Sequence, residues 1–123
     1  MAQHFNTRQR NNLLTGKKLA AEVPASAPNL RAFVEIWAHA ADREWGGVSR
    51  FLNADTSNLR FDLWKYEIDR SYYETDGWDP DHFTHGEVRE KGFTSLEEFQ
   101  RILCKYVDDL AAFDNDFRVD TPH

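Results

Sequence analysis

The chain has 123 residues, of which 41% are hydrophobic and 29% charged, as expected for one globular domain. No apolar run approaches the roughly 20 residues of a transmembrane helix, and the single cysteine excludes an intrachain disulfide. The formal net charge of −6 repels phosphate backbones and argues against nucleic acid as the main partner. Residues 1–10 are polar and basic rather than signal-like, so we expect a cytoplasmic protein without a membrane partner.

Charge divides the chain into two parts. Residues 1–23 carry four basic side chains against one acidic side chain, a net charge of +3, whereas residues 24–123 carry 11 basic and 20 acidic side chains, a net charge of −9. This division predicts a basic, partly ordered arm over 1–23 and a single globular domain over 24–123. Within the arm, 13–23 has the thin apolar pattern of a short helix, and the two prolines after it predict a turn or hinge.

A long helix is predicted to start at Asn29. Asn29 is a favourable N-cap residue, and Gly46-Gly47 supplies a C-terminal stop. Seven apolar residues between these points recur at spacings of one, three and four and share one helix face: Leu30, Phe33, Val34, Trp37, Ala38, Ala41 and Trp45. His39 falls near the polar edge of this helix, without a partner at metal-ligand spacing.

The segment 59–74 has two interpretations. It reads LRFDLWKYEIDRSYYE, and a helical period gathers four of its residues on one stripe, Phe61, Trp64, Ile68 and Tyr72. We therefore expect a helix. The alternative is a strand near 59–68, because Leu59, Phe61 and Leu63 alternate. A strand would need a bulge at Trp64, and it would make the fold α+β.

The C-terminal part combines an irregular stretch with a second firm helix. Residues 75–92 contain three glycines and a proline and predict a long connection. Over 94–113 an apolar stripe follows a helical period, and Ser95 and Glu98 form the pattern of a capping box. Cys104 lies among the apolar positions, where it needs only a packing role. The resulting prediction is a mainly α fold, a small helical domain with a loop-rich middle.

Acidic and aromatic residues are concentrated in 62–83. This segment contains seven acidic residues but only two basic residues, with six aromatic residues among them. Aromatic side chains supply contact area at interfaces, and clustered carboxylates speed the encounter with a basic protein. The bland interpretation is that the aromatic residues are core and the acids are a solvated face. The candidate partner-binding residues are Asp69, Tyr72, Tyr73, Glu74, Asp76, Trp78, Asp79 and Asp81.

Signals for chemistry are weak. The acids and histidines of 76–87 include plausible metal ligands, but their spacing matches no EF-hand loop, and His82 and His85 lack a helix or cysteine pair to complete a zinc site. No phosphate loop, nucleophile elbow, HExxH or CxxC motif is present. We therefore predict no catalytic residue, metal or cofactor. A small metal-dependent hydrolase using 76–87 stays as an alternative.

The segment WKYEIDRSYYETDGWDPDHF and the helix start SLEEF, in a short acidic chain, resemble the small acidic immunity proteins of bacterial toxin systems, including contact-dependent growth inhibition. The resemblance implies binding to one cognate toxin, often a basic nuclease whose active site the immunity protein covers. A phage or plasmid anti-defence protein that mimics nucleic acid would use an acidic surface in the same way. A structural subunit with an aromatic oligomer interface is a further hypothesis, and the oligomeric state is left open.

Overall fold

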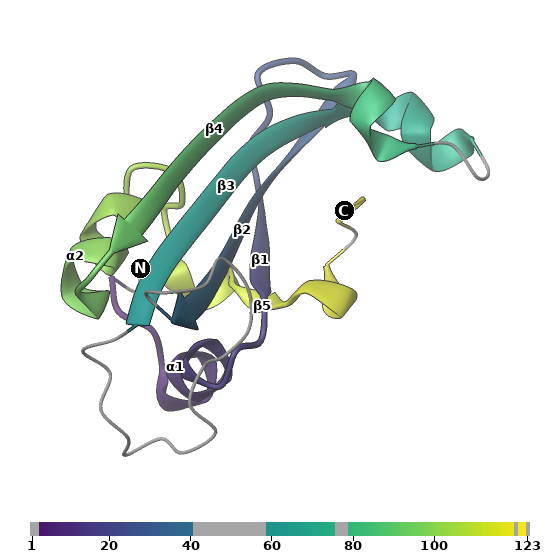
Figure 1. Ribbon diagram of the computed structural model, residues 1–123. Coiled ribbons are helices and arrows are strands. Elements are labelled where there is room, and N and C mark those ends of the chain that lie inside the picture. The colour runs from purple at the N-terminus through teal and green to yellow at the C-terminus, as the bar shows by residue number, and fades with distance from the viewer. Residues whose placement is uncertain (1–2, 41–58, 76–78, 120, 123) are drawn as a thin grey trace.

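The computed structural model describes residues 3–40, 59–75, 79–119 and 121–122, and its core is one curved antiparallel sheet of five strands in the order β4-β3-β2-β1-β5 (Figure 1). The strands are β1 (Leu19–Val23), β2 (Leu30–Ala40), β3 (Leu59–Asp69), β4 (Thr84–Phe93) and β5 (Asp114–Asn115). The helices are α1 (Thr7–Leu14) and α2 (Leu96–Leu103), with 3-10 turns η1 (Arg70–Glu74), η2 (Pro80–Phe83), η3 (Leu110–Ala112) and η4 (Asp116–Arg118). The mainly α prediction is therefore wrong, and the α+β alternative is confirmed.

The predicted helix beginning at Asn29 is strand β2 as far as the described residues extend. Its side chains alternate between two faces of the sheet, and every residue from Ala32 to Ala40 is buried. A strand buried on both faces reads as a continuous apolar run, which also satisfies a helical template. The remaining part of the predicted helix, 41–47, lies outside the described residues.

Strand β3 replaces the predicted helix over 59–74. It pairs with β2 without interruption from Asp69 opposite Leu30 to Leu59 opposite Ala40, so no bulge occurs at Trp64 in this ladder. The apparent change of phase between Leu63 and Trp64 arises because both faces carry apolar side chains. The last residues of the segment, from Arg70 onward, form η1.

Helix α2 is the N-terminal part of the helix predicted over 94–113. The Ser95 side chain accepts a hydrogen bond from the Glu98 backbone N–H, so the Ser95 half of the predicted capping box is confirmed. The helix ends at Leu103, and the chain then turns into η3, which Asp109 caps through the Ala111 N–H. The predicted stripe is nevertheless buried: Phe99, Leu103, Val107, Leu110 and Phe113 all belong to the core.

Two further segments differ from the prediction. The irregular connection predicted over 75–92 contains η2 and most of β4, and the short helix predicted over 13–23 is wrong, because α1 ends at Leu14 and residues 19–23 form β1. Helix α1 begins with a capping box between Asn6 and Gln9, and the buried Gln9 amide donates to the Leu110 and Phe113 carbonyls. These bonds tie the N-terminal helix to the C-terminal part of the chain.

The sheet separates two apolar clusters. The larger lies on the face covered by α1, α2 and η3, and includes alternate residues of β2 such as Val34 and Ile36. The smaller lies on the opposite face, where the C-terminal segment runs beneath the curve of the sheet (Figure 1). It is mainly aromatic and consists of Phe33, Trp37, Trp64, Tyr66 and Ile68, with Tyr72, Phe83 and Val119 packed against it.

Two glycines shape strand β4. Gly86 and Gly92 have φ of 59° and 79°, a conformation that favours glycine. At both places β4 uses three residues where β3 uses two, as in a β-bulge. At the second bulge the Gly92 N–H donates to the Asp62 carboxylate over 2.9 Å.

Phe99 anchors α2 to the sheet by stacking on Phe61 at a centroid distance of 5.4 Å, and it is fully buried. We expect Phe99→Ala to lower the free energy of unfolding by about 3–5 kcal/mol, because it leaves a cavity in the larger cluster. Urea unfolding measures this change. Arg101→Ala, on the exposed side of the same helix, should change stability by less than about 0.5 kcal/mol, and equal effects would contradict this packing.

Candidate protein-binding site

The connection between β3 and β4 forms a projection that we call the tip, residues 69–75 and 79–83. Figure 1 shows it extending from one end of the sheet, at the opposite end of β4 from α2. It contains η1 and η2, which contact each other. A solvent-exposed element at the end of a rigid sheet is a common place for a binding site.

Aspartates begin both 3-10 turns of the tip. Asp69 accepts from the Ser71 N–H and Asp79 from the Asp81 N–H, each over 3.0 Å. The bonds from Ser71 lower the pKa of the Asp69 carboxyl below its ordinary value. Both residues were predicted as charges for a partner, and the structure gives each of them a capping role that sequence reasoning did not assign.

Aromatic packing attaches the tip to the sheet. The Tyr72 ring lies 5.7 Å from Phe83 and 5.2 Å from Tyr73, and both Tyr72 and Phe83 pack against the smaller cluster. Tyr72 is therefore partly a core residue, as the bland interpretation of the aromatic residues expects. Tyr73 is 40% exposed and is available as a contact residue.

An arginine from β2 braces the tip. The Arg31 guanidinium lies 4.7 Å from the Tyr73 ring and 5.2 Å from the Phe33 ring, both within cation–π range. Its Nε and Nη2 donate to the two carboxylate oxygens of Glu22 over 2.9 and 2.8 Å. Arg70 adds a bond from Nε to the Pro28 carbonyl. The tip is thus fixed to the turn between β1 and β2.

Most of the predicted partner-binding residues come together on the tip. The turns η1 and η2 carry Tyr72, Tyr73, Glu74 and Asp81, and their caps are Asp69 and Asp79. Asp76 and Trp78 lie outside the described residues. Within the described part of 76–87, the predicted irregular loop is instead η2 and the start of β4, and the described residues contain no group of three His, Cys, Asp or Glu that could hold a metal ion.

Sequence reasoning missed a buried charge on the concave face of the sheet, the face that carries the smaller cluster. Glu35 of β2 is fully buried, and its Oε2 accepts a hydrogen bond from the Tyr66 hydroxyl of the neighbouring strand. Lys18 Nζ lies 2.6 Å from Oε1, so the carboxylate has a cationic partner. Burial, together with the negative charge of Glu35, raises the pKa of Tyr66 and keeps it a donor. The signal that the sequence offered for this buried charge was Glu35 itself, the one acidic residue in the otherwise largely apolar run of β2.

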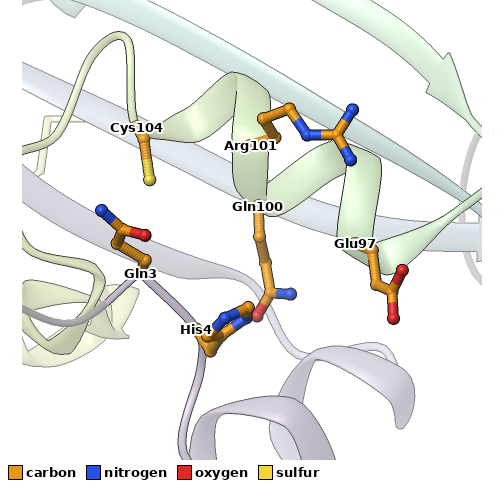
Figure 2. Close-up of a pocket in the computed structure, with 6 residues that line it drawn as sticks. All are labelled: Gln3, His4, Glu97, Gln100, Arg101 and Cys104. Atoms are coloured by element: carbon orange, nitrogen blue, oxygen red, sulfur yellow. The ribbon is translucent and has the colours of Figure 1, made fainter.

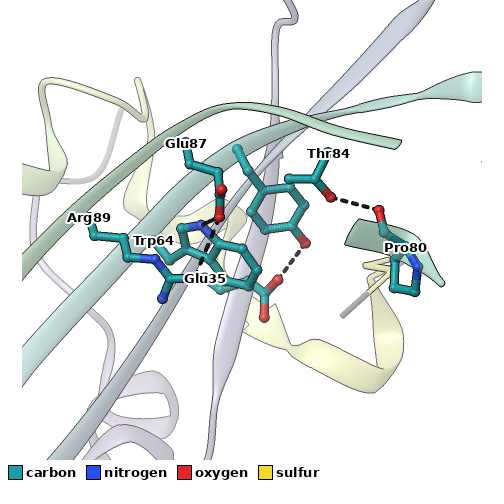
Figure 3. A network of polar contacts seen from close by, with 7 residues as sticks. Glu35, Trp64, Pro80, Thr84, Glu87 and Arg89 are labelled. Carbon is teal, nitrogen blue, oxygen red and sulfur yellow. Dashed lines mark hydrogen bonds and ion pairs between the residues drawn. The ribbon is translucent and has the colours of Figure 1, made fainter. Parts of the chain in front are cut away.

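Further polar contacts surround this carboxylate (Figure 3). The Trp64 indole donates to Glu87 over 3.0 Å, and the Arg89 guanidinium lies 4.2 Å from the Trp64 ring. The Thr84 hydroxyl donates to the Pro80 carbonyl over 2.9 Å, which joins the start of β4 to η2. The Trp64 contacts therefore join β3 to β4, and the Thr84–Pro80 bond separately holds the base of the tip.

His39 forms a buried ion pair rather than lying at a polar edge. Its Nε2 is 3.0 Å from Asp62 Oδ2, and its Nδ1 is 2.8 Å from the Ala40 carbonyl. Both ring nitrogens face acceptors, which fits an imidazolium that donates from both. Because Asp62 also accepts from Gly92, this contact joins β2, β3 and β4.

Comparison of the chain with protein-family models, with curated proteins and with solved structures finds no match. No helix in the described ranges is long and apolar enough to cross a membrane.

Lys18 is the cationic partner of the buried Glu35, so we expect Lys18→Met to lower the free energy of unfolding by about 2–3 kcal/mol. This expected loss in the free energy of unfolding is small for a buried pair, because Lys18 is 20% exposed and water reaches it. Adding Glu35→Gln should recover part of this loss, since it removes the uncompensated charge. Additive losses in the double variant would show that the pair carries no coupling.

The Arg31–Glu22 pair gives an expected pH dependence. The hydrogen bonds from Arg31 lower the pKa of Glu22 from its ordinary value of 4.5, so their contribution to stability is present above that value and is lost as the pH falls below it. We expect Arg31→Met to destabilise the chain at pH 7 and to have a smaller effect at pH 3. Glu22 is half-exposed, so the difference should be below about 1 kcal/mol in urea unfolding. If Arg31→Met lowers the free energy of unfolding equally at pH 7 and pH 3, the loss comes from the stacking on Tyr73 and not from the pair with Glu22.

Proposed function

We propose that this chain is an acidic protein-binding inhibitor that uses the tip to cover the active site of a basic partner. The partner that fits best is a cognate bacterial toxin, a nuclease, for which the chain would be the immunity protein. The observation that supports this proposal is that Tyr73 and three exposed acids, Glu74, Asp79 and Asp81, lie together on the tip, which Arg31 holds in place. The chain would act by binding and not by catalysis.

Charge on the tip supports a basic partner. The tip exposes carboxylates on both turns, and Arg70 is its one arginine or lysine among the described residues. An active site that binds nucleic acid is lined by cations, so these carboxylates would occupy the positions of phosphates. The interaction would be fast and would weaken as salt screens it.

The brace supports a preorganised binding surface. A partner that meets an already ordered element does not have to offset the entropy of ordering it. Arg31 and Glu22 hold η1 from one side, and the packing of Tyr72 on Phe83 holds it from within. Tyr73 then presents a partly exposed ring of the kind that dominates binding energy at interfaces.

A tagged pull-down from the native host at low and moderate salt tests the proposal, with captured proteins identified by mass spectrometry. The expected result is one stoichiometric basic protein, retained less well as the salt concentration rises. Capture of copies of the chain alone would favour a self-assembling subunit, and no capture at either salt concentration would reject the inhibitor proposal.

We expect Glu74→Gln, Asp79→Asn and Asp81→Asn together to slow association with the captured partner by roughly tenfold or more at low salt, and to flatten its salt dependence. Asparagine retains the cap that Asp79 supplies, so unfolding in urea should change little. Stopped-flow or surface-based kinetics measure the association rate.

The matched control changes three exposed acids near α2, far from the tip: Glu97→Gln, Glu98→Gln and Asp108→Asn. It alters the net charge by the same amount, so an effect equal to that of the tip variant would mean that overall charge, and not the tip, governs association. Tyr73→Ala completes the set. It should raise the dissociation rate, and the binding free energy lost in this way should exceed the loss in the free energy of unfolding.

A further inference from the structure

A polar pocket lies between the N-terminal segment and α2, away from the tip. Its volume is about 460 Å³, within the range of roughly 300–1,000 Å³ typical of small-molecule sites. Six residues line it, Gln3, His4, Glu97, Gln100, Arg101 and Cys104, and all have polar or sulfur-bearing side chains. Figure 2 shows Gln100 extending from α2 toward His4, with the Cys104 sulfur turned toward Gln3.

Gln100 places a fixed hydrogen-bond donor in this pocket. The residue is only 6% exposed, and its Oε1 accepts from the Phe5 N–H over 2.7 Å. That bond fixes the orientation of the amide, so Nε2 lies on the side of the amide that faces away from the Phe5 N–H. Nε2 donates to no residue in the described part of the chain. Nε2 is not one of the buried polar atoms without a partner, so it is open to the water of the pocket, and a ligand can replace that water as its acceptor.

The charges of the lining fit a ligand with both signs. Glu97 and Arg101 are four apart on α2, the usual spacing for an ion pair, yet neither has an ion-pair partner among the described residues. One carboxylate and one guanidinium give the pair no net charge. A simple anion would meet Glu97 and a simple cation would meet Arg101, so each is disfavoured.

We propose that this pocket binds a small zwitterion of the α-amino-acid class. The ligand carboxylate would accept from Gln100 Nε2 and be attracted by the positive charge of Arg101, and its ammonium group would be attracted by the negative charge of Glu97. The site is independent of the tip and of the inhibitor proposal. Cys104 stands at its rim with an exposed thiol, which corrects the packing role predicted from sequence.

The single thiol gives a site-specific readout. The full chain is incubated with each of the common L-α-amino acids, and the rate of Cys104 alkylation by iodoacetamide, a neutral reagent, is followed by mass spectrometry. Thermal unfolding is measured in parallel. At least one amino acid should slow alkylation and raise Tm in a concentration-dependent way. Acetate and methylamine, which each carry one half of the zwitterion, should do neither at the same concentration.

Substitutions then assign the contacts. Gln100→Glu retains the acceptor for Phe5 and replaces the donor with an oxygen, so binding should weaken roughly tenfold or more. Glu97→Gln should weaken binding similarly. Glu98→Gln is the matched control, because it removes an equal charge from the first turn of α2 without lining the pocket, and it should leave binding unchanged.

Three results would overturn the proposal. The first is that no amino acid both protects Cys104 and raises Tm. The second is protection by acetate equal to that of the amino acids, with Glu97→Gln strengthening it, which would identify an adventitious ion only. The third is unchanged binding in Gln100→Glu when the unliganded variant unfolds at the same temperature as the parent chain.

Discussion

The pairing of β2 with β3 is the constraint on which the rest of the structure depends. Eleven residue pairs join the two strands, and apolar side chains cover both faces of the ladder. Each face therefore needs its own cover. Helices α1 and α2 supply one, and on the other face Tyr72, Phe83 and Val119 pack on the aromatic cluster. Glu35 lies within this ladder, and a charge there requires partners that reach it, which are Tyr66 from β3 and Lys18 from just before β1.

Local sequence signals predicted caps and burial better than they predicted element type. The Ser95 cap is present because it depends on residues three apart, and the stripe from Phe99 to Phe113 is buried because apolar residues seek the core in any conformation. The helix predicted from Asn29 failed for a physical reason. A strand buried on both faces has no polar face, so its period of two is hidden, and alanines within it add helix propensity that tertiary pairing overrides.

The composition of the candidate site was readable from sequence, whereas its geometry was not. The excess of acids and tyrosines in 62–83 pointed to the tip, because charge and aromatic content do not depend on the fold. The Arg31 brace and the Lys18–Glu35 pair join residues that meet only through strand register. The interpretation of β2 as a helix placed these side chains on unrelated faces, so neither contact was foreseen. The pocket beside α2 likewise requires knowing that Phe5 lies against Gln100.

The two glycine bulges of β4 bear on how this protein behaves in a crowded solution. β4 is the outermost strand on its side of the sheet in the described residues, and an edge strand offers backbone groups on which another chain can add. Between Gly86 and Gly92 the edge carries Glu87, Arg89, Glu90 and Lys91 and one apolar side chain, Val88. A foreign strand would meet a run of five residues, four of them charged, with a bulge at each end. The bulge at Gly92 also binds Asp62 to the backbone, and together the two bulges and the charges between them disfavour the pairing of a second strand on this edge.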